Sequence, residues 1–271
     1  MGKKLDLETG IFAQRGTDPA TLKTAGFNFI ASFVKEIGQD FSPSHIYRGQ
    51  ANVAWDIQPT AFRPKQSGIT DQTRLRFWIN EVRRSGSSRA QNYIEYMVLA
   101  RHFGIATPLL DWSANPLVAL FFACQPTKKA SDSKAHAVVF KCSRDNFNEM
   151  WRNDSITVFA DREIPALFDA SAMNDRSTAQ NSLMTLHSPR CSKVTKAVEV
   201  IRVPAQLKHA VIYALPTYGI VDSRIFSDYS LAAKHFESTA NAQDLIDQFR
   251  QWGEMASEPA DPPSSQNDLA D

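Results

Sequence analysis

The sequence predicts an α+β fold in which a helical N-terminal half packs on a mixed or antiparallel sheet. Apolar residues recur at helical spacing before Cys124, and short apolar runs that are typical of strands dominate after it. Helices and strands are therefore grouped along the chain, which favours α+β over an alternating α/β fold. We find no internal repeat, and we predict a lead-in over residues 1–20 followed by one domain over residues 21–253.

Two helices are predicted before residue 90. The first spans residues 21–38, where apolar residues fall at helical spacing and Gly38 marks the end. The second spans residues 72–84, and four of its apolar residues share one face: Leu75, Trp78, Ile79 and Val82.

A third helix is predicted from about residue 91 to Phe103, and Gly104 follows it as a left-handed terminator. Its apolar side is expected to comprise Ile94, Met97, Val98 and Phe103.

A fourth helix is predicted to begin at Asn115 and Pro116, a typical N-cap and first-turn pair, and to run through Cys124. Because this segment is apolar on all sides, we expect it to be buried. Cys124 is then a small core residue rather than a reactive thiol. The three cysteines lack a Cys-x-x-Cys spacing, so we expect neither disulfides nor a metal site.

Extended segments are predicted at residues 45–47 and 107–113. Further strand candidates follow the fourth helix at residues 135–142, 156–160, 182–187 and 197–203. A short helix is expected to begin at Pro204, residues 210–215 fit either a helix or a strand, and residues 231–236 and 245–252 have helical patterns.

The charge of the chain is unevenly distributed. Five of the 29 acidic residues lie after Gly253, where there is no Lys or Arg, and residues 254–271 are predicted to form a disordered acidic tail. The rest of the chain is mildly basic, which suits an anionic ligand but falls short of typical nucleic-acid-binding proteins.

The apolar runs are too short to cross a bilayer, and no secretion signal is expected at the first residues. We therefore expect no membrane partner and a cytoplasmic location. The sequence does not identify a protein partner.

The motif Tyr47-Arg48-Gly49 ends the first predicted strand. An Arg at this place can form a planar, bidentate clamp on a phosphate or carboxylate, and Gly49 lets backbone or ligand approach closely. The alternative is that Arg48 is structural and pairs with a buried acid such as Asp111.

A second polar group lies just before the fourth helix. Asp111 can support the site, by satisfying Arg48 or a backbone turn, or can orient a substrate hydroxyl. Thr107 and Ser113 are candidates for hydrogen bonds to a ligand. His102 can cap the end of the third helix or act as a base, and His187 has no stronger support.

Residues 62–90 are rich in Lys and Arg and contain only two acids. The run suits a nucleic-acid or nucleotide-phosphate face, or simply a solvated helix face. Its basic residues are Arg63, Lys65, Arg74, Arg76, Arg83, Arg84 and Arg89.

Three blocks together resemble the FRG domain, a prokaryotic family named for its Phe/Tyr-Arg-Gly signature. They are YRG at 47–49, PTAFR at 59–63 and HFGIATPLLDWSANPLVALFFA at 102–123, with weaker echoes at AQNSLMTLH (179–187) and GIVDSRIF (219–226). The resemblance covers roughly residues 41–141 and trails to about residue 236. This chain has Arg101 where the family usually has Gln, and Pro108 where it usually has Arg; the second departure removes a phosphate ligand.

The layout of the family is similar to the ADP-ribosyltransferase plan: an Arg or His on a first strand, a Ser/Thr-bearing strand before a helix, and a later acid or amide. The resemblance thus implies an NAD-consuming, ADP-ribosyltransferase-like bacterial toxin or antiphage effector. Arg48 would hold the pyrophosphate or a ribose, and Thr107 and Ser113 would brace the nicotinamide ribose. Gln180 would take the place of the usual acid, for which Glu163 and Glu199 are spare candidates.

Two other interpretations stay open at this stage. One is a non-catalytic module that binds a nucleotide or a nucleic acid, and the Arg-rich run favours it. The other is an interaction scaffold whose acidic tail recruits a basic partner.

Overall fold

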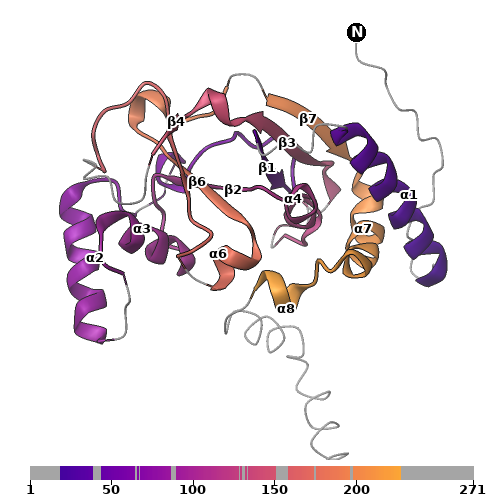
Figure 1. The fold of residues 1–271 in the computed structure, drawn as a ribbon, viewed down its shortest axis with the longest axis horizontal. Coiled ribbons are helices and arrows are strands. Elements are labelled where there is room, and N and C mark those ends of the chain that lie inside the picture. The colour runs from indigo at the N-terminus through magenta and orange to yellow at the C-terminus, as the bar shows by residue number, and fades with distance from the viewer. Residues whose placement is uncertain are drawn as a thin grey trace, which may run out of the picture. The chain divides into compact units, whose positions relative to one another are not determined.

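The α+β prediction is confirmed by a computed structural model of the chain (Figure 1). The structure describes residues 19–38, 44–64, 66, 68–86, 90–127, 129, 132, 134–150, 158–173, 175–195 and 198–226. Within these ranges a seven-stranded sheet has the order β4-β5-β6-β2-β1-β3-β7. Neighbouring strands in this sheet are antiparallel, except for β4 and β5, which are parallel.

The strands are β1 (His45–Gln50), β2 (Leu109–Ser113), β3 (Ala137–Ser143), β4 (Asn148–Glu149), β5 (Ala166–Asp169), β6 (Ser182–Leu186) and β7 (Val198–Val203). The helices are α1 (Pro19–Ile37), α2 (Gln72–Ser85), α3 (Tyr93–His102), α4 (Pro116–Cys124), α6 (Asp175–Ala179), α7 (Lys208–Ala214) and α8 (Asp222–Ile225).

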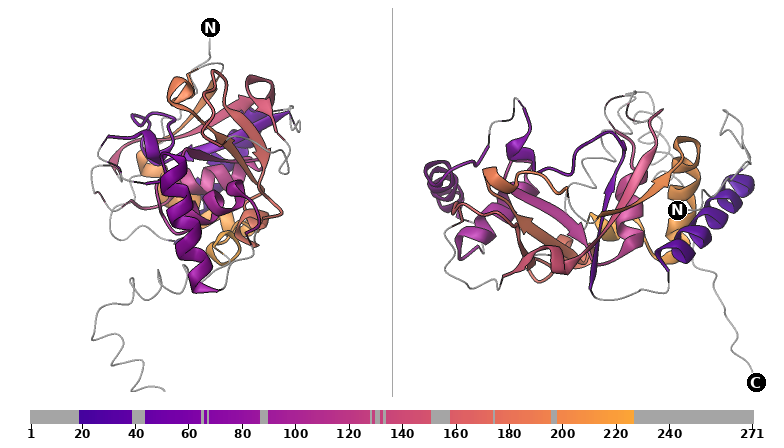
Figure 2. Two further views of the ribbon diagram at one scale, coloured as in Figure 1. Left: turned by 90° about the vertical axis from the view of Figure 1, so that its left-hand side faces the viewer. Right: turned by 90° about the horizontal axis from the view of Figure 1, so that it is seen from above.

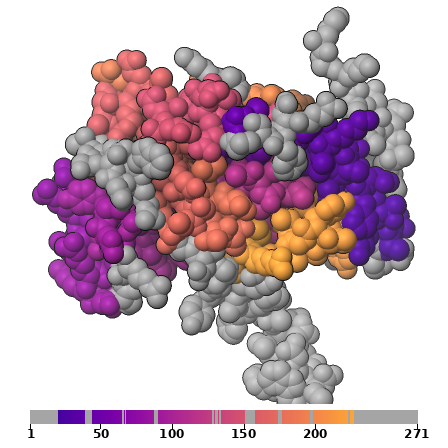
Figure 3. Space-filling model, in the orientation of Figure 1, coloured from indigo at the N-terminus to yellow at the C-terminus, as the bar shows by residue number. Residues whose placement is uncertain are grey.

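The helices gather in two groups (Figure 2). Helix α4 packs against β1 and β3, α7 packs on α4, and α1 packs on α7. Helices α2 and α3 pack on each other at the other end of the sheet, where α3 contacts β2. The space-filling view accordingly shows α2 and α1 on opposite sides of the described part (Figure 3).

The two central strands barely pair with each other. Strand β1 pairs with β3 at six positions, but with β2 only at Tyr47 and Ser113. Strand β2 pairs along its whole length with β6 instead. The sheet therefore opens between β1 and β2 beyond this single pair.

The predicted helices agree closely with the observed ones because local signals determine their ends. Gly38 and Gly104 both have positive φ, at 76° and 78°, where the helices stop. The side chain of Asn115 accepts a hydrogen bond from the Leu117 backbone N–H, as expected of an N-cap. Residues 210–215, left ambiguous by the sequence, are mostly helical and lie in α7 and the turn that follows.

Two expectations about local structure are wrong, and two strands were missed. Phe103 does not share the buried side of α3: it follows the helix as its C-cap and is 67% exposed. Residues 158–160, in the strand expected at 156–160, form no strand, because buried Val158 contributes to the core from a turn. The short strands β4 and β5 were not predicted.

Several expected segments lie outside the described residues. They are the lead-in up to residue 18, residues 156 and 157, the two helices expected after residue 230, the domain boundary at residue 253 and the acidic tail.

The cysteines behave as core residues. Cys124, Cys142 and Cys191 are buried and form no disulfide. Burial raises the pKa of the Cys124 thiol far above its usual value, so it stays protonated. The described ranges contain no cluster of side chains that could hold a metal ion. They also contain no helix that is long and apolar enough to span a membrane.

Gly49 is where β1 meets α4. A Cβ atom at this position would lie 1.8 Å from the backbone oxygen of Ala119 and 2.6 Å from the backbone nitrogen of Ala123. The sequence left open whether backbone or ligand comes close to Gly49. In the structure it is the backbone of the buried helix α4. Gly49 holds the neighbouring Arg48 at a fixed distance from α4.

We expect Gly49→Ala to lower the free energy of unfolding by about 3 kcal/mol, because helix α4 must move to admit the methyl group. Gly104→Ala is the control: the φ of Gly104, 78°, is unfavourable for Ala, but its Cβ would meet open space. Its cost should be roughly 1 kcal/mol, from the left-handed backbone alone. Urea unfolding of both variants measures the difference, and equal losses would contradict the packing role of Gly49.

Candidate functional site

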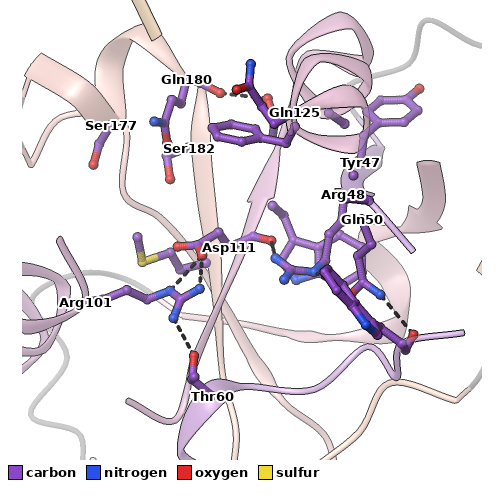
Figure 4. Close-up of a pocket in the computed structure, with 18 of the residues that line it drawn as sticks. Tyr47, Arg48, Gln50, Thr60, Arg101, Asp111, Gln125, Ser177, Gln180 and Ser182 are labelled. Carbon is purple, nitrogen blue, oxygen red and sulfur yellow. Dashed lines mark hydrogen bonds and ion pairs between the residues drawn. The ribbon is translucent and has the colours of Figure 1, made fainter. Parts of the chain in front are cut away.

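A pocket of about 490 Å³ lies where β1 and β2 part, with α3, α4 and β6 completing its walls (Figure 4). Six of the predicted site residues line it: Arg48, Gly49, His102, Asp111, Ser113 and Gln180. The fold thus brings together residues that are up to 132 positions apart in the chain.

Arg48 crosses the opening between β1 and β2. Its Nη1 donates a hydrogen bond of 2.5 Å to the backbone oxygen of Asp111, and its Nε contacts Gln50 Oε1 at 3.4 Å. A direct strand-to-strand bond is missing here, and the guanidinium replaces it. Burial lowers the pKa of Arg48 to about 10, so the group remains charged at neutral pH.

The sequence left open that Arg48 pairs with Asp111. In the structure Arg48 bonds to the backbone oxygen of Asp111 and not to its carboxylate. The Asp111 carboxylate instead accepts two hydrogen bonds from Arg101, through Nε at 2.7 Å and through Nη2. Arg101 Nη1 also donates to Thr60 Oγ1 at 2.9 Å. Burial acts to lower the pKa of Arg101. The charge of Asp111 and its hydrogen bond to Arg101 together have the larger effect, so the pKa of Arg101 is raised.

A third guanidinium completes the cationic wall. Arg63 lines the pocket and donates two hydrogen bonds, of 3.2 and 3.0 Å, to the backbone oxygen of Gln58. Burial and the charge of Arg101 lower the pKa of Arg63. The pocket wall therefore carries three arginines and, among its described residues, a single carboxylate, that of Asp111.

The remaining predicted residues of the wall have structural partners. Ser113 Oγ donates to the backbone oxygen of Gln180 at 2.7 Å and accepts from the Asn115 backbone N–H. The side-chain amide of Gln180 donates to the backbone oxygen of Ile225 at 3.0 Å. His102 lies at the end of α3 with its ring edge-on to Phe103.

Other predicted residues lie away from the pocket. Thr107 is fully buried beside β2, where its Oγ1 accepts a weak hydrogen bond from the Leu109 backbone N–H, and it does not line the pocket. The spare acids are also remote: Glu163 pairs with Arg190, and Glu199 pairs with Lys141.

The Arg-rich run divides into two parts in the structure. Arg63 faces the pocket, whereas Arg74 and Arg84 form surface ion pairs with Asp71 and Glu81 on α2. Arg83 lies over the ring of Tyr96. Lys65 and Arg89 are outside the described residues.

The sequence interpretation gave no role to several residues that line the pocket, among them Trp55, Thr60, Arg101 and Ser182. For Arg101 a signal was present, since it is one of the two departures from the family pattern. Thr60 lies within the resembling block at 59–63 and Trp55 lies just before it, but neither had an assigned role. Ser182 was hidden inside a strand pattern.

His187 supports the strands behind the pocket. Its Nδ1 lies 2.6 Å from the backbone oxygen of Cys191, which can only accept, so Nδ1 carries the proton. Nε2 then accepts from Thr185 Oγ1 at 2.8 Å, and Thr185 accepts from Trp112 Nε1 at 3.0 Å. The chain of hydrogen bonds joins β2 to β6 and needs a neutral imidazole. His187 is thus a structural group.

Comparison with known proteins gives one match. Residues 43–132 match the FRG domain, so the chain contains an FRG domain over that segment. No curated protein and no solved structure matches the chain.

Burial lowers the pKa of His187 from 6.5 to about 4, and the nearby Arg48 charge acts in the same direction. Between these values the unfolded chain binds a proton that the folded chain does not. His187 should therefore remove about 3 kcal/mol of stability as the pH falls through this window. Imidazole nitrogen shifts in NMR should show the Nδ1–H tautomer down to about pH 4, and a midpoint near 6.5 would contradict this.

Proposed function

We propose that this FRG domain-containing chain binds NAD in the pocket and acts as an ADP-ribosyltransferase-like enzyme. The observation that carries the proposal is the gathering of Arg48, Arg63 and Arg101 around one pocket that contains a single described carboxylate. Such a wall suits a ligand with two negative charges, and the pyrophosphate of NAD carries two.

The size and polarity of the pocket support a nucleotide ligand. Its volume of about 490 Å³ falls within the roughly 300–1,000 Å³ that is common for small-molecule sites. Trp55 and Phe122 add aromatic surface to the wall, and Trp55 is 39% exposed. Aromatic faces stack well on nucleobases, whereas arginine forks suit phosphate oxygens.

The arrangement of strands also supports the proposal. The analogy with ADP-ribosyltransferases requires an Arg on a first strand, a Ser or Thr on a strand before a helix, and a later acid or amide. Arg48 lies on β1, Ser113 ends β2 just before α4, and Gln180 comes just before β6. These strands are neighbours in the sheet, so the three positions face one pocket.

In the proposed reaction the bond between the nicotinamide nitrogen and the ribose carbon breaks. The ribose carbon then bonds to an acceptor nucleophile, which loses its proton. Arg48 and Arg63 would hold the phosphates, and Gln180 would hydrogen-bond a ribose hydroxyl. Because Gln180 has no negative charge to stabilise the cationic transition state, we expect slow turnover.

A second candidate is a nucleotide-binding module without turnover. The specific observation in its favour is that the Asp111 carboxylate is engaged by Arg101 and that Gln180 is neutral. A nucleic-acid function is less well supported, because two of the arginines of α2, Arg74 and Arg84, form ion pairs with the neighbouring acids Asp71 and Glu81.

Three substitutions test the proposal. Arg63→Ala should weaken NAD binding about tenfold, because a charge-assisted hydrogen bond is lost while the contact between β1 and β2 stays intact. Arg48→Lys keeps the charge but loses the planar fork, and should abolish nicotinamide release. Arg84→Ala, on the exposed surface of α2, is the matched control and should change neither. Calorimetry measures binding, and a nicotinamide-release assay measures turnover.

The outcomes separate the candidates. NAD binding with nicotinamide release supports the enzyme, and binding without release supports the nucleotide-binding module. If wild-type protein does neither, the proposed function is wrong. A role as a toxin or antiphage effector further requires that expression slows bacterial growth and that Arg48→Lys relieves this effect.

A further inference from the structure

Ser182 is the first residue of β6 and lines the pocket, yet it is only 2% exposed. Within the described ranges, the structure contains no hydrogen bond to its hydroxyl. The backbone oxygen of Ser182 is satisfied by the Ala170 N–H, so the strand itself is intact. Among the described residues, the side chain of Ser182 is thus left without a hydrogen-bond partner.

Other serines of similar burial show how unusual this is. Ser113, paired with Ser182 across β2 and β6, bonds to Gln180 and Asn115. Ser188 is 3% exposed, and its Oγ donates to the backbone oxygen of Arg162 at 2.7 Å. Buried hydroxyls in folded proteins nearly always have a partner, and an exception calls for a functional or solvent explanation.

The surroundings of Ser182 indicate what its partner is. In Figure 4, Ser177, Gln180, Ser182 and Gln125 lie on one side of the pocket, and Arg101 and Thr60 lie on the other. The described side chains labelled around Ser182 carry hydroxyls and amides but no charge. It therefore suits a neutral polar group, whereas the arginine wall suits an anion.

We propose that Ser182 contacts the ligand, and that its hydroxyl hydrogen-bonds a neutral oxygen of a ligand whose phosphates lie against the arginines. The oxygen belongs to a ribose hydroxyl or to a carboxamide. This inference rests on the proposed function and adds a specificity-determining residue to it. It also assigns the two sides of the pocket to the two chemically different parts of one dinucleotide.

The test is Ser182→Ala with four ligands of decreasing size: NAD, ADP-ribose, ADP and inorganic pyrophosphate. The variant should bind NAD about three- to tenfold more weakly, the loss expected for one neutral hydrogen bond. Pyrophosphate binding should not change, because it needs only the arginines. If the loss disappears from NAD to ADP-ribose, the carboxamide is the partner; if it disappears from ADP-ribose to ADP, the second ribose is.

Thermal unfolding of the free protein gives an independent readout. Removing an unpartnered hydroxyl should leave the melting temperature of Ser182→Ala unchanged or raise it. Ser188→Ala is the matched control: the same substitution at similar burial removes a satisfied hydroxyl. It should lower the melting temperature by about 2–4 °C and leave NAD affinity unchanged.

Two results would overturn the inference about Ser182. The first is a lower melting temperature for Ser182→Ala, which would show that the hydroxyl is bonded within the protein. The second is unchanged NAD affinity in this variant while Arg63→Ala weakens binding. If wild-type protein binds none of the four ligands, the proposed function fails, and the melting temperature still decides whether the hydroxyl is unpartnered.

Discussion

The guanidinium of Arg48 bridges the opening between β1 and β2, and the rest of the site depends on this contact. These two adjacent central strands pair with each other at a single position, Tyr47 and Ser113. Arg48 supplies a donor to the Asp111 oxygen from the side chain instead. The pocket lies at the same opening that the arginine spans.

Such an opening is stable only because the flanking pairs are strong. Strand β1 is held by β3 along six positions and by α4, which packs directly against Gly49. Strand β2 is held by β6 along five positions, and the hydrogen bonds from Trp112 through Thr185 to His187 reinforce this pair. Each central strand is thus fixed by its outer neighbour.

The concentration of positive charge has a cost that the protein offsets in part. Arg101 and Arg63 both act to lower the pKa of Arg48, as like charges do at short range. The Asp111 carboxylate forms an ion pair with Arg101 and so offsets one of the three positive charges. A ligand with two negative charges would neutralise the other two, so binding and electrostatic relief favour the same event.

Local signals made much of the fold predictable from the sequence. The N-cap at Asn115 and the left-handed stop at Gly104 depend only on nearby residues, and both were predicted correctly. The partner of the Asp111 carboxylate was not predicted, because the sequence does not show whether Arg48 or Arg101 lies closer to it. The choice depends on how β1 and β2 diverge. Thr107 was placed at the site because it precedes β2, but its side chain points into the core.

Ser182 illustrates a limit of a different kind. Nothing in the alternation of a strand distinguishes a serine that bonds to its neighbours from one that does not, since the difference lies in the surrounding three-dimensional contacts. A protein selected for stability alone would gain from an apolar residue at this position, because an unpartnered buried hydroxyl is costly. The position of Ser182 in the pocket wall, across from the arginines, is therefore what makes its hydroxyl a candidate ligand contact, and only the three-dimensional structure shows it.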